Sequence, residues 1–169
     1  MIVRAPYFAI VGSVTQPYAM AICVGGGPAP GINSVIGAAT IRGELEGVDV
    51  LGIRDGFEWI MHGNVDHVEP LRIDDVRPIH FTGGSYIGIS RANPTLDPQH
   101  LENTVISLLR LNVSQLITIG GDDTAFSAMK LEEKSAGRAT ASRTSAGSET
   151  RKVSWPARRR IGARRRSSR

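Results

Sequence analysis

Three short runs of apolar residues, each ending at a turn, set the pattern of this chain. They cover residues 19–24, 48–53 and 116–119, and glycine or aspartate follows each run within two positions. Apolar runs of this length, bounded by turn residues, are typical of strands that are buried on both faces of a parallel sheet. The pattern therefore predicts three buried strands.

Helical spacing appears between these runs, where apolar residues recur every three or four positions. The residues are Ile32, Val35, Ile36 and Ala39 after the first run, and Leu101, Val105, Leu108 and Leu109 before the third. A strand, a helix and a second strand form a right-handed parallel unit. We therefore predict an α/β fold with three layers around a mostly parallel sheet, truncated after the third strand and followed by a disordered tail.

Two glycine-rich turns lie between the first and the third predicted strands. Residues 25–31 read Gly-Gly-Gly-Pro-Ala-Pro-Gly before a helix, and residues 83–91 carry hydroxyl groups and end in Arg91. Free backbone N–H groups and a helix N-terminus favour an anion, and an arginine fork suits a phosphate or a carboxylate. The first turn has no P-loop signature, so a plain structural turn explains it equally well.

A third turn, residues 120–124, reads Gly-Gly-Asp-Asp-Thr and ends the last apolar run. Its glycines let a ligand approach the backbone, and its two carboxylates suit a divalent cation or a phosphate bound through one. Aspartate is also a favoured helix N-cap, so capping of the next helix is an alternative of equal weight.

Taken together, the three turns resemble the 6-phosphofructokinase family, and the resemblance covers most of residues 20–138. The segments that carry the resemblance are residues 25–33, 83–91 and 120–124. The resemblance implies that Gly26, Arg91, Gly121 and Thr124 bind the phosphates of the donor and that Asp122 binds Mg²⁺.

The residue after the metal-binding aspartate distinguishes the donors used in that family. ATP-dependent members usually have glycine there, whereas pyrophosphate-dependent members have aspartate, and here it is Asp123. Its charge and bulk would oppose the α-phosphate of ATP and admit pyrophosphate. The resemblance thus implies phosphoryl transfer in glycolysis, from pyrophosphate or alternatively ATP to the 1-hydroxyl of fructose 6-phosphate, with Mg²⁺ as cofactor and Asp123 supporting donor selection and the transition state. It also implies that longer relatives are homo-oligomers.

Charge divides the chain near its C-terminal quarter. Residues 1–133 hold 8 Lys and Arg against 15 Asp and Glu, a net charge of −7, and residues 134–169 hold 12 against 1, a net charge of +11. We predict an N-terminal extension over residues 1–18, as an extra strand or a disordered segment. A phosphofructokinase-like donor-binding region follows over residues 19–138, and a basic, disordered tail over residues 139–169.

The tail raises two hypotheses. Members of the family continue with a Thr-Ile-Asp motif whose aspartate is the general base, and this sequence has no counterpart. We therefore expect the chain to be an incomplete, inactive fragment whose tail is read from a shifted frame or prematurely ended. The alternative function is a non-catalytic module that binds nucleic acid or an acidic partner through its Arg-rich tail, with an affinity that falls as salt is added.

Three single residues complete the sequence predictions. Cys23 is the one cysteine and lies in an apolar run, which predicts an inert, buried thiol in a reducing, cytoplasmic setting. His62 and His67 lack a third ligand at metal-site spacing, so we predict solvated loop residues. No apolar run has the length of a membrane span, so no membrane partner is expected.

Overall fold

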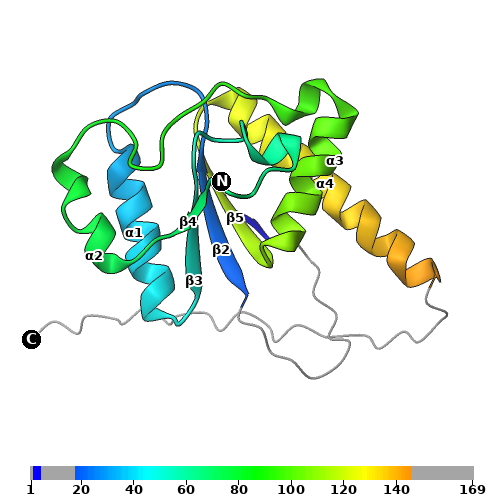
Figure 1. The fold of residues 1–169 in the computed structure, drawn as a ribbon, viewed down its shortest axis with the longest axis horizontal. Helices are drawn as coiled ribbons and strands as arrows, with labels where there is room; N and C mark the ends of the chain where they lie inside the picture. Colours follow the sequence, from blue (N-terminus) through cyan, green and yellow to red (C-terminus); the bar gives the residue numbers. More distant parts are fainter. Residues whose placement is uncertain (1, 5–17, 146–169) are drawn as a thin grey trace, which may run out of the picture.

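The computed structural model describes the backbone of residues 2–4 and 18–145 and the side chains of residues 18–137. The strands are β1 (Ile2–Arg4), β2 (Ala19–Val24), β3 (Asp49–Ile53), β4 (Val68–Pro70) and β5 (Val113–Ile119). The helices are α1 (Ile32–Leu45), α2 (Ile73–Val76), α3 (Pro98–Arg110) and α4 (Asp122–Ser145), with short 3-10 turns η1 (Ile60–His62), η2 (Ile79–Phe81) and η3 (Pro94–Leu96). Figure 1 shows α1 and α2 on one side of the sheet and α3 and α4 on the other.

The strands form one sheet in the order β1-β5-β2-β3-β4. Strand β2 pairs in parallel with both β3 and β5, and the short edge strands β1 and β4 pair antiparallel. All six residues of β2 are buried, as a strand covered by helices on both faces requires. The three-layer α/β fold with a mostly parallel sheet is therefore confirmed.

The side chains of β2 alternate between two separate hydrophobic cores, one on each face of the sheet. Ala19, Ala21 and Cys23 point to the layer of α3 and α4, where they pack with side chains such as Val105 and Leu131. Met20, Ile22 and Val24 point to the layer of α1 and α2 and pack with residues such as Ile36 and Val76. This two-residue period is the one that a strand imposes on its side chains.

Local signals set the helix ends. Helix α1 ends at a turn in which the Gly47 N–H donates to the Glu44 carbonyl at 3.0 Å and Gly47 has a φ of 72°, a backbone conformation that favours glycine. Helix α3 begins with Pro98, and the Asp97 side chain accepts a hydrogen bond from the Gln99 N–H at 2.7 Å.

Both terminal segments extend beyond the described part of the chain. Strand β1 lies in the predicted N-terminal extension and pairs with β5, whereas residues 5–17 are outside the described residues. The boundary predicted at Arg138 falls inside α4, which continues to Ser145. The predictions for the rest of the basic segment concern residues 146–169, which also lie outside the described residues.

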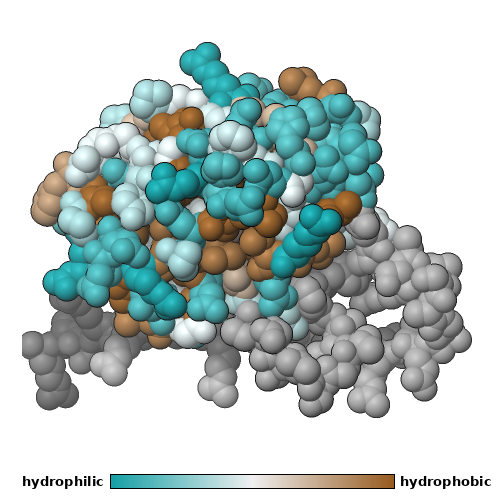
Figure 2. All heavy atoms as spheres, viewed as in Figure 1, coloured by the Kyte–Doolittle hydropathy of each residue, from teal (hydrophilic) through white to brown (hydrophobic). Residues whose placement is uncertain are grey.

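The surface agrees with this layering. Figure 2 shows apolar atoms gathered over the strands between the two helical layers, and polar atoms over most of the helices. Among residues 2–4 and 18–145, no helix combines the length and the apolar character needed to cross a membrane.

Candidate functional site

The three glycine-rich turns meet at one edge of the sheet. Strands β2, β3 and β5 are parallel, so their carboxyl ends point the same way, toward the top of Figure 1. The first turn leaves β2 there, and the third leaves β5 and enters α4. Open α/β sheets bind ligands at this edge, so it is the first place to look for chemistry.

The first and third turns are in direct backbone contact. The Gly25 N–H donates to the Ile119 carbonyl at 2.8 Å. A Cβ built on Gly120 would lie 2.6 Å from the Gly25 carbonyl oxygen, and one built on Gly25 would lie 2.5 Å from Thr124 Oγ1. Neither position has room for a side chain, which explains why both are glycine.

The second turn joins the other two through its end. The Gly26 N–H donates to the Ser90 carbonyl at 2.9 Å, and Gly25 and Ser90 form an isolated parallel bridge. Arg91 follows Ser90 directly and is exposed. The three segments, far apart in sequence, therefore share one short stretch of backbone at Gly25 and Gly26.

Most of the residues predicted to bind the donor lie at this junction with open space around them. Gly26 has a φ of 94°, and a Cβ built on it would be 4.0 Å from the Gly121 nitrogen. A Cβ built on Gly121 would meet nothing within 4 Å. Thr124 is different: it is 6% exposed, and its hydroxyl packs under the backbone of Gly25. Its side chain packs against the backbone of Gly25 and Gly120.

Asp122 and Asp123 form the first turn of α4 and are both exposed. Negative charge is favourable at a helix N-terminus, so the capping alternative and the cation-binding alternative both place these carboxylates here. Their exposure leaves their oxygens open to a ligand.

Asp122 and Asp123 could be ligands of a magnesium ion that phosphate groups also coordinate. Among the described residues, no group of three or more His, Cys, Asp and Glu side chains is arranged to hold a metal ion. Mg²⁺ is usually held by one or two carboxylates together with substrate phosphates and water. Asp122, with Asp123 beside it, could supply such carboxylates.

Two residues at this edge were not assigned a role from sequence. Asp55 has a φ of 54°, donates its N–H to the Ile87 carbonyl at 2.9 Å, and accepts a hydrogen bond from Trp59 Nε1 at 3.1 Å. A Cβ on Gly88 would collide with its carboxylate. The side chain of Asn33 also forms hydrogen bonds with the second turn, to the backbone of Thr82 and Tyr86. No role was assigned to Asp55 from sequence, because its contacts with the second glycine turn, at Ile87 and Gly88, lie more than thirty positions away.

The other candidate residues stay outside the site. Cys23 is fully buried, and burial raises the pKa of its thiol to about 12, so it has no nucleophilic role, in agreement with the prediction. His62 is exposed as predicted. His67 is half-buried and stacks on Trp59 with ring centroids 4.0 Å apart, so it is less solvated than predicted because an aromatic face covers it.

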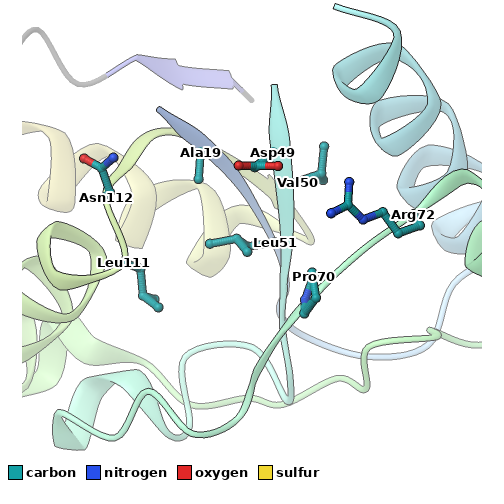
Figure 3. A pocket seen from close by; sticks show the side chains of 8 residues that line it. All are labelled: Ala19, Asp49, Val50, Leu51, Pro70, Arg72, Leu111 and Asn112. Carbon is teal, nitrogen blue, oxygen red and sulfur yellow. The ribbon is translucent and has the colours of Figure 1, made fainter. Parts of the chain in front are cut away.

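A hollow of about 340 Å³ lies at the opposite edge of the sheet, at the amino ends of the strands (Figure 3). It is lined by Ala19, Asp49, Val50, Leu51, Pro70, Arg72, Leu111 and Asn112. None of these residues belongs to a glycine-rich turn. The hollow is therefore separate from the junction described above.

The fold and the junction define a class: an α/β protein whose glycine-rich turns meet at the carboxyl ends of its parallel strands, with two acidic residues beside them. Residues 19–153 match the Phosphofructokinase family. The chain belongs to this family.

Individual relatives agree with the match. The pyrophosphate--fructose 6-phosphate 1-phosphotransferase of Thermotoga maritima is 51% identical over 118 residues, which are 70% of this chain and 28% of that protein. An ATP-dependent 6-phosphofructokinase of Glaesserella parasuis is 30% identical over 115 residues, 68% of this chain and 35% of that protein. The chain thus spans about a third or less of either relative.

A solved structure supports the fold. The structure of Pichia pastoris phosphofructokinase in the T-state matches with a TM-score of 0.67, at 23% identity, over 76% of this chain and 14% of that one. The likeness extends the phosphofructokinase assignment from the sequence to the arrangement of the sheet and helices.

Proposed function

We propose that this chain binds pyrophosphate with Mg²⁺ and forms the donor-phosphate part of a phosphotransferase that acts on fructose 6-phosphate. The observation that carries the proposal is the junction of three glycine turns beside Asp122 and Asp123. The name of the Thermotoga maritima relative supports pyrophosphate as the donor.

Backbone groups would provide most of the phosphate contacts. The turn at Gly26 and Gly121 leaves space for a ligand against the main chain. Helix α1 begins after Gly31 with no side-chain cap and no acidic residue in its first turn, so its N-terminal N–H groups are left for an anion. Arg91 would add a charged fork to these neutral donors.

Asp122 would hold the metal ion through one carboxylate, with phosphate oxygens and water completing its coordination. When bound, Mg²⁺ neutralises charge on the phosphates and assists their transfer. Without the ion, the two aspartates would repel pyrophosphate, so we expect donor binding to require Mg²⁺.

Asp123 would select the donor. A carboxylate next to the bound phosphates repels a third phosphate and the nucleoside attached to it, whereas pyrophosphate ends before that position. Two charges about 4 Å apart interact by roughly 1 to 4 kcal/mol, between the limits of water and of a protein surface, which corresponds to a preference of about fivefold or more.

Calorimetric titration of the chain with pyrophosphate and with ATP, each with Mg²⁺, tests this selection. We expect tighter binding of pyrophosphate, and we expect Asp123→Gly to raise the affinity for ATP by at least about fivefold. Asp49→Gly, at the opposite edge of the sheet, is the matched control and should change neither affinity. If Asp123→Gly leaves ATP binding unchanged, the selection argument fails.

A coupled assay addresses transfer to the sugar. Because the sequence offers no counterpart of the family's general base, we predict little or no turnover of fructose 6-phosphate by this chain with either donor. Normal turnover would contradict the expected inactivity and leave donor binding to be judged by the titrations.

A further inference from the structure

Asn33 is a buried residue whose side chain spans the start of the second glycine turn. It is 4% exposed and lies in the first turn of α1. Its Nδ2 donates to the Thr82 carbonyl at 2.9 Å, and its Oδ1 accepts from the Tyr86 N–H at 2.8 Å. Both amide groups are therefore used on the segment that leads to Arg91.

This use of an asparagine differs from its ordinary local role. Asparagine near a helix start usually accepts hydrogen bonds from N–H groups of its own helix. Helix α1 has no side-chain cap from Gly31, and Asn33 is turned to a segment about fifty positions later in sequence. Leaving a buried amide group without a hydrogen bond costs free energy. The two hydrogen bonds of Asn33 therefore stabilise the one loop conformation that satisfies both.

The bridged segment needs an external anchor. Residues 82–84 are exposed, and Gly84 has a φ of 82°. Glycine-rich backbone loses much conformational freedom when it is fixed. The far end of the turn is fixed by the hydrogen bond from the Gly26 N–H to the Ser90 carbonyl at 2.9 Å. Gly26, in the β2–α1 connection, and Asn33, in the first turn of α1, therefore hold the two ends of the turn.

We infer that Asn33 is a positioning residue that fixes the second glycine turn, and with it Arg91, against the first. Its effect on the donor rests on the proposed function. Its effect on the loop can be measured without any ligand.

Asn33→Asp is the informative substitution in the full chain. It keeps the size of the side chain and the acceptor for the Tyr86 N–H, but it replaces the donor to Thr82 with a charged oxygen. We expect hydrogen exchange at the Tyr86 amide to accelerate, and the affinity for Mg²⁺-pyrophosphate to fall, each by about tenfold or more.

Asn103→Asp is the matched control. Asn103 Nδ2 donates to the Met61 carbonyl at 3.2 Å, between α3 and η1 in the other helical layer. The substitution removes the same kind of bond and can lower overall stability. It should leave both Tyr86 exchange and pyrophosphate affinity at the parent values.

A pH series separates positioning from general damage. The carboxyl introduced at position 33 is buried, which raises its pKa, and once protonated it can again donate to Thr82 while accepting from Tyr86. The ratio of variant to parent affinity should therefore recover as the pH falls from about 7 to about 5, a range that brackets a burial-raised carboxyl.

Three results would overturn the inference: unchanged Tyr86 exchange in Asn33→Asp, an equal loss of affinity in Asn103→Asp, or faster loop exchange with unchanged pyrophosphate affinity. If the parent chain binds no pyrophosphate, the proposed function fails. The exchange rates then still decide whether Asn33 fixes the loop.

Discussion

The two edges of the same parallel sheet are built in opposite ways. At the carboxyl edge, the backbones of Gly25 and Gly120 approach so closely that neither position accepts a Cβ. At the amino edge, Asp49, Arg72 and Asn112 line an open hollow of about 340 Å³. The hollow therefore lies at the edge where the glycine-rich turns do not converge.

The difference shows what a phosphate site requires of this fold. A small anion is recognised by backbone N–H groups and helix N-termini, which demand close backbone approach and glycine more than a large cavity. The carboxyl edge supplies the beginnings of α1 and α4 together, and the amino edge supplies neither. We expect substitutions at the two edges to have very different effects.

Among the substitutions, Gly120→Ala should have the largest effect. Its new Cβ would meet the Gly25 carbonyl and the Thr124 hydroxyl, so we expect a loss of about 2 to 3 kcal/mol in the free energy of unfolding, together with loss of pyrophosphate binding. Urea unfolding measures the first quantity and calorimetry the second. Gly121→Ala, with free space around it, is the control and should change stability by less than about 0.5 kcal/mol. Equal stability of the two variants would contradict the tight junction.

High pH should lower the free energy of unfolding through Cys23, which lies in β2, the strand that runs between the two edges. Burial raises the pKa of the Cys23 thiol from 9.0 to about 12. The folded state holds its proton more tightly than the unfolded state, so this stabilising contribution is complete below pH 9 and is lost as the pH rises through about 12.

The loss should approach about 1.4 kcal/mol for each pH unit in that window. The difference in free energy of unfolding between the parent chain and Cys23→Ala isolates the contribution of the thiol. It should be measured from about pH 8, below the ordinary pKa of cysteine, to about pH 11. A constant difference between the two chains would show that Cys23 is accessible to solvent.

Asp55→Ala should have a smaller, local effect at the carboxyl edge. It removes the acceptor of the Trp59 indole and the carboxylate that packs on Gly88, so we expect a loss of about 1 kcal/mol. Tryptophan fluorescence should shift, because the indole loses its partner. Asp74→Ala is the control, since that side chain is 93% exposed and should leave both readouts unchanged. A fluorescence shift of equal size in both variants would refute a specific role for Asp55.

Arg72→Ala should have the smallest effect on function. Arg72 lines the hollow at the amino edge, so its loss should leave pyrophosphate affinity within twofold of the parent, roughly the scatter expected for a distant site. Titration of the variant provides the check. A marked loss of affinity would make the amino edge part of the donor site.

Sequence reasoning predicted the elements better than their contacts. The run at residues 19–24 coincides with β2, and the strand-turn-helix order around Gly26 and Asp122 placed the turns at one edge. Hydrophobic period and turn residues are local signals, so they are readable along the chain. The bridge from Asn33 to Tyr86 and the burial of Thr124 depend on tertiary packing, and no local pattern encodes them.

Backbone NMR during titration with Mg²⁺-pyrophosphate tests the central claim most directly. If the carboxyl edge binds the donor, amide signals of Gly26, Gly121 and Arg91 should shift together with one affinity, while those of Asp49 and Asn112 should not move. Shifts confined to Asp49 and Asn112 at the amino edge, or no shift at the three glycine turns under saturating pyrophosphate, would contradict it.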